Sequence, residues 1–175
     1  MHDRIERAFI GVAGNIEPRQ HLPEALEKLA KHVALLRLSR FFVTPAIGRA
    51  EQPDYYNAVV LIQTDIPPRT LKFDVLRGIE RDLGRVRGPD KYAARTVDLD
   101  ILLYGTRVVA ESGLEIPDPD LCERAFLAAG VLELAPGIRM PGGDAPLCEL
   151  VDANAIAGLR TDNVFSNEMQ ERFLT

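Results

Sequence analysis

The clearest candidates for chemistry in this chain are two aspartates separated by one residue. Asp98 and Asp100 stand in an otherwise apolar run, with Arg95 just upstream. Side chains at i and i+2 of a β-strand share one face, so both carboxylates are expected to project together. The alternate side chains would then enter a core: Leu99, Ile101 and Leu103. Paired carboxylates repel unless a cation lies between them, which predicts a Mg2+ site; two solvated acids at a strand end are the alternative.

A basic loop precedes the acidic pair. Residues 85–95 read Arg-Val-Arg-Gly-Pro-Asp-Lys-Tyr-Ala-Ala-Arg, with four cations and one anion. The Gly-Pro pair indicates a loop. Mg2+ can bridge phosphate oxygens to carboxylates while Arg or Lys neutralises the remaining charge, so the combination is suited to a polyphosphate. A solvated loop is the alternative, but the whole chain carries a net charge of −5, against which a local basic segment stands out.

These segments resemble the signature of a known enzyme family. Arg85-Val-Arg87, followed by the run from Arg95 to Gly105, is similar to the signature of 6-hydroxymethyl-7,8-dihydropterin pyrophosphokinase, which acts in folate biosynthesis. Other segments agree in their order along the chain: residues 9–15, 44–48, 52–59, 79–85 and 116–136. The resemblance covers about residues 8–150.

The resemblance implies an activity and a metal requirement. The family transfers a pyrophosphoryl group from its co-substrate ATP to the hydroxymethyl oxygen of a reduced pterin and releases AMP. Asp98 and Asp100 match aspartates that hold two Mg2+ ions, and the metal would activate the attacking hydroxyl, since no separate general base is evident. The other two catalytic matches are Arg95, a phosphate contact, and Arg85, in a mobile loop whose closure would exclude water.

The resemblance also assigns residues to two substrate subsites. The nucleotide side would contain Glu80, Arg87, Lys91, Tyr92, Arg95, Ile101 and Arg124. The pterin side would contain Thr44, Pro45, Ile47, Tyr55, Asn57 and Phe126. The Asn57 amide suits the donors and acceptors of a pterin edge, and Tyr55 and Phe126 suit stacking on its ring. Alternatives are that Glu80 is only a helix-surface acid and that Phe126 belongs to the core.

Three departures from the family pattern leave a second interpretation open. Asp118 stands where the family has a phosphate-contacting histidine, Ala93-Ala94 replace Gly-Pro, and Ala13-Gly14 replace Gly-Ser. An acid at position 118 would weaken ATP binding unless it turns outward or caps the next segment. The alternatives to the enzyme are a catalytically impaired relative that binds pterin or nucleotide, and an interaction domain whose acids are merely solvated.

Length and composition limit the other possibilities. The chain has 175 residues, 46% of them hydrophobic and 27% charged, which predicts one soluble domain over residues 1–175. It has no apolar run of membrane-spanning length, and its N-terminal residues lack a signal-peptide core, so we expect a cytoplasmic monomer without a membrane partner. Cys122 and Cys148 lack metal-site spacing and indicate free thiols. A pI of about 5.3 argues against nucleic acid as a partner.

The elements that must position these residues can be outlined from periodicity. Strands are expected at 7–12, 36–43, 57–64 and 98–104. A helix should begin at Pro23, and a short one should cover 123–134. The longer helix after Pro67-Pro68 should bury Leu71, Val75, Ile79 and Leu83 and end at Gly84. This order predicts an α+β fold of the ferredoxin-like βαββαβ type, with helices on an antiparallel sheet and extra C-terminal elements. Residues after about Asn154 are expected to be peripheral.

Overall fold

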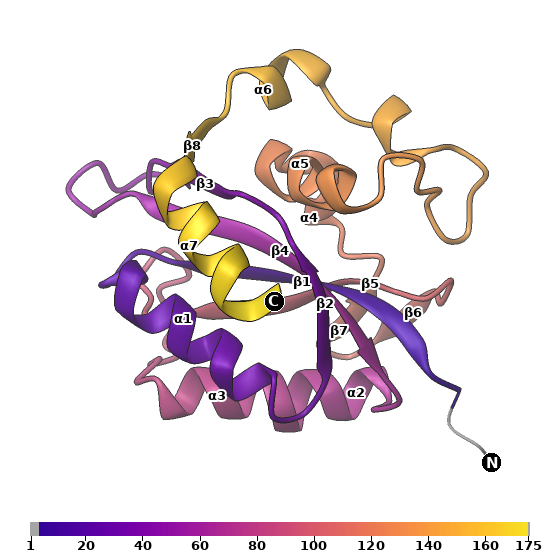
Figure 1. Cartoon of the computed structure of the whole chain (residues 1–175), viewed down its shortest axis with the longest axis horizontal. Helices are drawn as coiled ribbons and strands as arrows, with labels where there is room; N and C mark the ends of the chain where they lie inside the picture. Colours follow the sequence, from indigo (N-terminus) through magenta and orange to yellow (C-terminus); the bar gives the residue numbers. More distant parts are fainter. Residues whose placement is uncertain (1–3, 175) are drawn as a thin grey trace.

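A computed structural model of the protein describes residues 4–174 and shows a six-stranded sheet with helices on both faces (Figure 1). Residues 1–3, part of the segment predicted to lack a signal peptide, lie outside the described residues. The strands of the large sheet are β1 (Glu6–Gly14), β2 (Ala34–Leu38), β3 (Phe41–Thr44), β4 (Tyr55–Thr64), β5 (Asp98–Tyr104) and β8 (Arg160–Asp162). A separate hairpin contains β6 (Val109–Glu111) and β7 (Leu114–Ile116).

The strands run antiparallel to their neighbours in the order β5-β1-β4-β3-β8, and β2 also pairs with β4. The helices are α1 (Pro18–Leu29), α2 (Pro68–Thr70), the π-helical η1 (Leu71–Leu76), α3 (Arg77–Asp82), α4 (Asp120–Glu123), α5 (Ala125–Leu134), the 3-10 helix η2 (Leu147–Glu149), α6 (Ala153–Ala157) and α7 (Asn163–Leu174). An α+β architecture with an antiparallel sheet is therefore confirmed.

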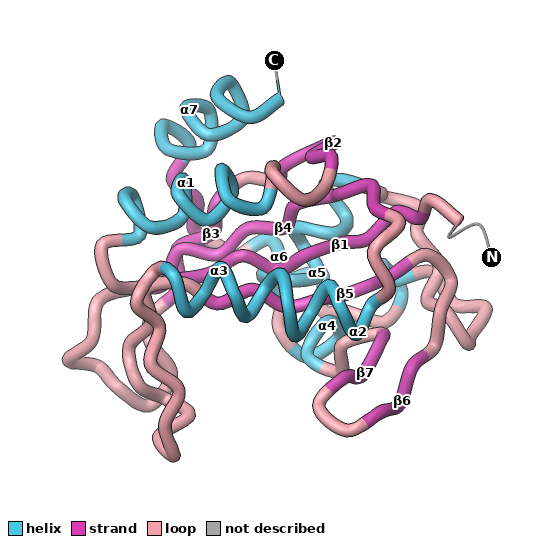
Figure 2. Tube along the Cα trace, turned by 90° about the horizontal axis from the view of Figure 1, so that it is seen from below, coloured by secondary structure: helices cyan, strands magenta, loops and turns pink. Residues whose placement is uncertain are grey.

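The helices form two layers, each with its own part of the core. Helices α1 and α3 lie on one side of the sheet, and α5 and α6 lie on the other (Figure 2). The first layer encloses Leu26, Ile79 and Phe165, whereas the second encloses Leu102 and Val131. Burial of these side chains is the main stabilising contribution, roughly 1.5–3 kcal/mol for each fully buried large apolar group.

A β-bulge in β5 changes which side of the sheet its later side chains face, which corrects the expectation for Leu103. The register against β1 shifts between Phe9 and Ile10, which leaves an extra residue on the β5 side. Leu99 and Ile101 enter the core beneath α1 and α3 as expected, but Leu103 does not. It lies with Leu102 on the opposite side, because the bulge reverses the alternation after Ile101.

Other expected boundaries also need correction. The first helix begins at Pro18 rather than Pro23, because proline is accommodated in the first turn and Pro23 then lies inside the helix. The expected strand 36–43 is divided into β2 and β3 at Ser39-Arg40. The expected helix 123–134 is interrupted at Arg124, whose backbone is extended. The strand 98–104 is confirmed at both ends.

The second long helix contains a π-helical segment that changes its buried face. Its i→i+5 turns place Leu76 in the core and leave Val75 partly exposed, which corrects the expected four-residue spacing. Helix α3 ends at Asp82, and Gly84 follows its C-cap with a φ of 80°, which glycine adopts without strain. The Gly84 and Arg85 amides donate to the carbonyls of Arg81 and Glu80, respectively, which is a Schellman ending.

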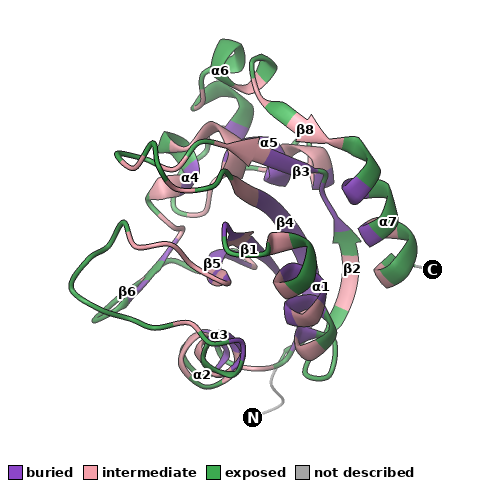
Figure 3. Cartoon of the chain, turned by 90° about the vertical axis from the view of Figure 1, so that its left-hand side faces the viewer, coloured by how far each residue is buried: buried purple, intermediate pink, exposed green. Residues whose placement is uncertain are grey.

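The C-terminal residues are not peripheral, contrary to expectation. Strand β8 extends the sheet beside β3, and Phe165 and Met169 of α7 enter the core. Figure 3 shows buried positions on α7 facing the sheet. Weak amphipathic periodicity hid this packing, because only one narrow stripe of α7 is buried. No helix within residues 4–174 has the length and apolar character needed to cross a membrane.

Candidate active site

A cleft of about 560 Å³ lies on the sheet face that carries α4 and α5. Its floor comes from β1, β4 and β5, and its walls come from the loops around residues 44–47 and 91–95 and from the start of α5. Gly11, the β1 partner of Asp100, lines this floor without a side chain, and the Leu102 and Leu127 side chains lie 3.5 Å from the position that its Cβ would take. The volume is within the usual range for a small-molecule site.

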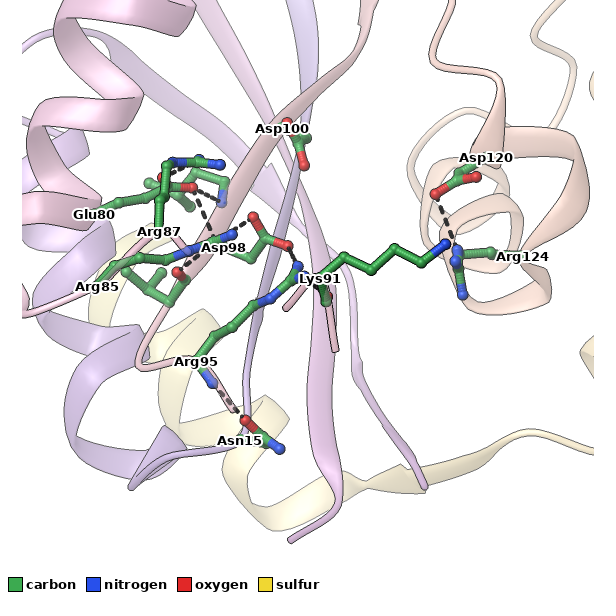
Figure 4. A network of polar contacts seen from close by, with 12 residues as sticks. Asn15, Glu80, Arg85, Arg87, Lys91, Arg95, Asp98, Asp100, Asp120 and Arg124 are labelled. Atoms are coloured by element: carbon green, nitrogen blue, oxygen red, sulfur yellow. Dashed lines mark hydrogen bonds and ion pairs between the residues drawn. The ribbon is translucent and has the colours of Figure 1, made fainter. Parts of the chain in front are cut away.

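Asp98 lies at one end of the cleft between two arginines. Its Oδ1 accepts a hydrogen bond from Arg85 at 2.5 Å, and its Oδ2 accepts one from Arg95 at 2.5 Å (Figure 4). Burial alone would raise the pKa of Asp98, but the two guanidinium groups more than offset it and lower the pKa. Asp98 is therefore a fixed negative charge.

Asp100 is compensated much less. It shares the cleft face with Asp98, and its nearest cation is Lys72 of η1, with Nζ 3.4 Å from Oδ1. Burial and the charge of Asp98 raise the pKa of Asp100 to about 7. Two carboxylates on one strand, of which only one is neutralised by arginine, leave a local need for positive charge.

Glu80 has a buried supporting position rather than a place on the cleft surface. Glu80 is 1% exposed, and its Oε1 accepts a hydrogen bond from the Leu99 amide at 2.9 Å. The same carboxylate forms ion pairs with Arg85 at 3.4 Å and Arg87 at 2.5 Å. Since Leu99 lies between Asp98 and Asp100, Glu80 ties the acid pair to the end of α3.

The basic loop is held by hydrogen bonds at several points. Asn15 is buried, and its Oδ1 accepts from the Arg95 amide at 2.8 Å while its Nδ2 donates to Gln52 at 3.1 Å. Gln52 in turn donates to the Tyr92 carbonyl at 2.9 Å. The Lys91 side chain extends across the cleft toward α4 (Figure 4). These bonds fix the backbone of the loop, so that the Arg95 side chain reaches Asp98.

Asp118 lies in the cleft lining and also caps the next segment. Its Oδ1 accepts a hydrogen bond from the Asp120 amide at 2.8 Å, so it begins the turn into α4. Burial is the main reason that the pKa of Asp118 is raised. Arg124, one turn after Asp120, donates a hydrogen bond from its Nε to Asp120 Oδ2 at 3.0 Å. The cleft wall at the start of α4 therefore carries two carboxylates, Asp118 and Asp120, and the guanidinium of Arg124.

The predicted pterin-side residues come together on the β4 side of the cleft, across β1 from the acid pair of β5. Asn57 is buried on β4, and its Nδ2 donates to Thr44 Oγ1 at 2.9 Å and to the Phe42 carbonyl at 3.2 Å. Its Oδ1 receives no hydrogen bond from residues 4–174 and remains available to the cleft that Asn57 lines. Tyr55 and Phe126 also line it, together with Pro45 and Ile47. Burial raises the pKa of Tyr55, so its hydroxyl stays neutral.

A close helix-to-sheet approach positions Phe126. A Cβ on Gly130 would come within 2.5 Å of Val59 Cγ2, so only glycine allows α5 to lie this close to β4. Phe126 is consequently half-buried on the cleft wall rather than enclosed in the core. The structure thus argues against the core alternative for Phe126, and stacking on a ring stays a prediction.

The predicted residues therefore divide into two groups. The cleft is lined by Thr44, Pro45, Ile47, Tyr55, Asn57, Lys91, Tyr92, Arg95, Asp98, Asp100, Arg124 and Phe126. Arg85, Arg87 and Glu80 lie behind Asp98, and Ile101 is 2% exposed in the core on the other face of β5. Sequence reasoning gave no role to Lys72 or Asp120. Their only signal was a charged residue at the first turns of a helix, which is common on solvated surfaces.

The cleft residues suit a magnesium ion that is shared with a phosphate ligand. Asp98 and Asp100 present hard oxygen donors on one face, and the described residues contain no cluster of three or more His, Cys, Asp or Glu side chains that could hold a metal. Mg2+ keeps several waters and often takes only one or two carboxylates plus substrate phosphates. The donor set fits that mode and does not form a complete protein cage.

A cleft that combines an acid pair, converging cations and an amide beside aromatic side chains is typical of enzymes that transfer phosphoryl-type groups. The family model described as 7,8-dihydro-6-hydroxymethylpterin-pyrophosphokinase (HPPK) matches residues 9–136. The chain belongs to this family, which confirms the resemblance seen in the sequence.

Individual relatives agree with the family assignment. The chain is 33% identical to a 2-amino-4-hydroxy-6-hydroxymethyldihydropteridine pyrophosphokinase of Pseudomonas aeruginosa, over 89% of this chain and 96% of the relative. It is 35% identical to the enzyme of the same name from Haemophilus influenzae, over 82% of this chain and 90% of the relative. Both relatives are covered almost completely, so their length is comparable to that of this chain.

Solved structures with low sequence identity share the fold. The crystal structure of Plasmodium falciparum HPPK-DHPS with pterin and p-hydroxybenzoate superposes with a TM-score of 0.67 at 12% identity. The match covers 99% of this chain, but the chain spans only 44% of that protein. This comparison supports the arrangement of sheet and helices.

Proposed function

We propose that the protein transfers a pyrophosphoryl group from ATP to the hydroxymethyl group of 6-hydroxymethyl-7,8-dihydropterin and releases AMP, as a step of folate biosynthesis. The observation that carries this proposal is the convergence of the acid pair, the cations of the basic loop and the Asn57 amide in one cleft. Membership of the pyrophosphokinase family over residues 9–136 supports the same reaction.

Alignment and charge neutralisation are the main tasks of such a site, because the transferred group itself carries most of the developing charge. Arg95 lines the cleft and would contact the phosphate oxygens. Arg85, behind Asp98, keeps that carboxylate charged and fixes its direction. Lys91 and Arg124 approach from opposite walls and would bind the remaining phosphates.

The acid pair is the proposed magnesium site. Mg2+ held by Asp98 and Asp100, as two ions with ATP, would neutralise the phosphates and lower the pKa of the attacking hydroxyl. Each carboxylate oxygen retains a second lone pair beside its arginine or lysine contact, so these contacts do not prevent metal binding. Glu80 and Arg87 act on the nucleotide side as supports, and Ile101 acts as core.

The pterin would occupy the end of the cleft near Asn57. The free Oδ1 of Asn57 can accept a hydrogen bond from the heterocycle while Nδ2 stays bound to Thr44 and Phe42. Tyr55 and Phe126 supply aromatic surface at the same end, and Pro45 and Ile47 supply apolar contacts. Water exclusion by the basic loop would protect the transferred group from hydrolysis.

Further features of the protein follow from the same proposal. The strand order β5-β1-β4, with β2 and β3 beside β4, supports a ferredoxin-like classification of the fold. We also propose that residues 1–175 form a single domain, that the protein acts as a monomer, and that it works in the cytoplasm. Two exposed free cysteines, Cys122 and Cys148, support a reducing compartment.

The direct test measures AMP release by the purified full chain with ATP, Mg2+ and 6-hydroxymethyl-7,8-dihydropterin. Pterin-dependent AMP and a pyrophosphorylated pterin are expected, and both should disappear in Asp98→Ala. A folded protein that binds ATP and pterin but releases no AMP would instead be a catalytically impaired relative. Asp118, an acid in the cleft lining, is the observation that keeps this alternative open.

Asn57 provides a subsite-specific prediction. Asn57→Ala removes the amide that faces the pterin end, so the KM for the pterin should rise about tenfold or more while the KM for ATP changes less than about twofold. Gln63→Ala is the matched control, because Gln63 lies on the same strand but outside the cleft. Equal increases in both KM values would contradict the assigned role.

A further inference from the structure

The C-terminal segment 160–174, which we call the C-terminal brace, pairs with a very short strand of the sheet. Strand β8 aligns Arg160, Thr161 and Asp162 with Val43, Phe42 and Phe41 of β3. On its other side β3 pairs with β4 only from Phe42 to Thr44. Because β3 contains four residues, the brace supplies about as much of its pairing as β4 does.

Helix α7 of the brace also satisfies backbone groups at the break between β2 and β3. Ser166 Oγ accepts a hydrogen bond from the Phe41 amide at 2.8 Å, and Gln170 Nε2 donates to the Leu38 carbonyl at 2.9 Å. Ser166 is fully buried, so the Phe41 amide has no access to water as a replacement partner. The start of β3 therefore depends on α7.

Aromatic packing fastens the same helix to the pterin-side strands. The Phe165 ring lies 4.8 Å from that of Phe41 and 5.6 Å from that of Tyr56, measured between centroids. The Tyr56 hydroxyl also donates to Asp162 at 3.1 Å. Tyr56 directly precedes Asn57 on β4, so the brace contacts both strands that carry the pterin-side residues.

Strand β3 in turn fixes the Asn57 amide. Two of its groups, the Phe42 carbonyl and the Thr44 hydroxyl, accept the hydrogen bonds that orient Asn57 Nδ2. With Nδ2 held in this way, Oδ1 faces the cleft. A small movement of β3 away from β4 would break both of these bonds. Asn57 Nδ2 would then keep only the Tyr55 carbonyl of its own strand, a longer contact of 3.5 Å, so the amide could rotate.

We propose that the C-terminal brace positions the pterin subsite by holding β3 against β4, so that the Asn57 amide keeps a single orientation toward the cleft. This inference rests on the proposed function, since it assigns the pterin to the Asn57 end. The brace does not touch the cleft itself, and its residues are positioning residues rather than catalytic ones. Loss of the brace contacts should therefore raise the KM for the pterin and leave the KM for ATP nearly unchanged.

The test compares Ser166→Ala and Tyr56→Phe with the control Glu168→Ala in the full-length chain. Ser166→Ala removes the acceptor of the Phe41 amide, and Tyr56→Phe removes the bond to Asp162 while keeping the ring packing. Glu168 lies on α7 with its side chain 61% exposed, and its ion pair with Arg19 is long, at 3.9 Å. All assays are made well below each variant's melting temperature, so that only folded protein is compared.

Three readouts separate positioning from simple destabilisation. In the two variants the KM for 6-hydroxymethyl-7,8-dihydropterin should rise about three- to tenfold, with kcat and the KM for ATP within about twofold of the original values. Equilibrium binding of 6-hydroxymethylpterin should weaken in parallel. The side-chain amide protons of Asn57, observed by NMR without ligand, should exchange faster with solvent than in Glu168→Ala.

The outcomes distinguish this inference from the proposed function. A lower melting temperature with unchanged pterin KM, pterin binding and Asn57 exchange would overturn the inference and leave the brace as plain structural support. Absence of AMP formation in the original protein would overturn the proposed function instead. In that case the Asn57 exchange rates still decide whether the brace orients the amide.

Discussion

At the scale of single residues, the two aspartates of β5 have opposite environments although they are two positions apart. Asp98 accepts hydrogen bonds from Arg85 and Arg95, whereas Asp100 has only the more distant Lys72. The first is therefore a stabilised charge, and the second is a charge that the metal-free protein tolerates poorly. This difference is expected at a site that receives a cation together with its substrate.

Asp100→Asn should therefore separate activity from stability. The substitution removes a proposed Mg2+ ligand, so AMP release should fall at least about a hundredfold. In EDTA the variant should be more stable than the original protein by about 1 kcal/mol at pH 8, a value reduced for partial exposure. The pKa of Asp100 is raised from 3.8 to about 7, so this advantage should develop as the pH rises between those values and vanish below them.

Chemical denaturation at pH 5 and pH 8 would measure this stability difference. Asp98→Asn is the matched comparison, because it leaves the nearly buried guanidinium of Arg85 with a weaker partner. It should lose activity and stability together. A destabilised Asp100→Asn protein at pH 8 without metal would contradict the view that Asp100 is poorly compensated.

At the scale of elements, the end of α3 is what brings the supporting charges to the acid pair. The Schellman ending turns the chain at Gly84, so that Arg85 points back toward Asp98 while Glu80, on the last turn, reaches the Leu99 amide. An edge strand normally exposes its outward amides to solvent. Here one of them is satisfied by a helix side chain, which couples the helix end to the site.

Gly84→Ala should weaken this coupling through the backbone alone. A Cβ at Gly84 would have nothing within 4 Å, so the only cost is the left-handed conformation, about 1 kcal/mol for alanine. Stability should fall by about that amount, and kcat should fall because Arg85 is displaced. Gly84→Asn is the control, since asparagine adopts this conformation more easily and should retain most of both properties. Identical losses in both variants would argue against a conformational cause.

At the scale of the whole molecule, the last strand and helix close the sheet and connect distant parts of the chain. Asp162 joins three elements through its carboxylate. It accepts hydrogen bonds from Arg19 of α1 at 2.5 Å, from the Tyr56 hydroxyl of β4, and from the Phe165 amide at the start of α7. The bond from the Phe165 amide is the main reason that the pKa of Asp162 is lowered. Three elements therefore depend on one carboxylate.

The contribution of Asp162 to stability should depend on pH with a defined sign. Because its pKa is lowered in the folded state, its charge stabilises the protein above the unfolded value of 3.8, and this stabilisation is lost as the pH falls through the folded-state pKa. Asp162→Asn should cost about 0.5–1 kcal/mol at pH 7 and progressively less below pH 4. Urea unfolding at several pH values measures the difference, with Asp65→Asn as control, because Asp65 is an exposed acid outside the Asp162 network. A constant difference at all pH values would contradict the electrostatic origin.

The three long strands β1, β4 and β5, the order of the main elements and the acid pair could be predicted from the sequence because they depend on local patterns. Alternating apolar residues set the strand 98–104, and two aspartates at i and i+2 must share a face whatever surrounds them. Gly84 predicted a helix end for a similarly local reason. The grouping of Thr44, Asn57 and Phe126 came from resemblance to a family, and the cleft they line is consistent with that grouping.

Only the tertiary structure decided which charges compensate each other and which segment supports the site. Lys72 pairs with Asp100, and buried Glu80 accepts a hydrogen bond from the Leu99 amide. Both contacts join residues far apart in sequence, and hydrophobic periodicity contains no information about such pairs. The bulge in β5 and the π-helical turn at Leu76 are likewise set by packing against neighbours. The C-terminal brace looked peripheral because its buried stripe is narrow; its position became evident from its pairing with β3, a non-local contact.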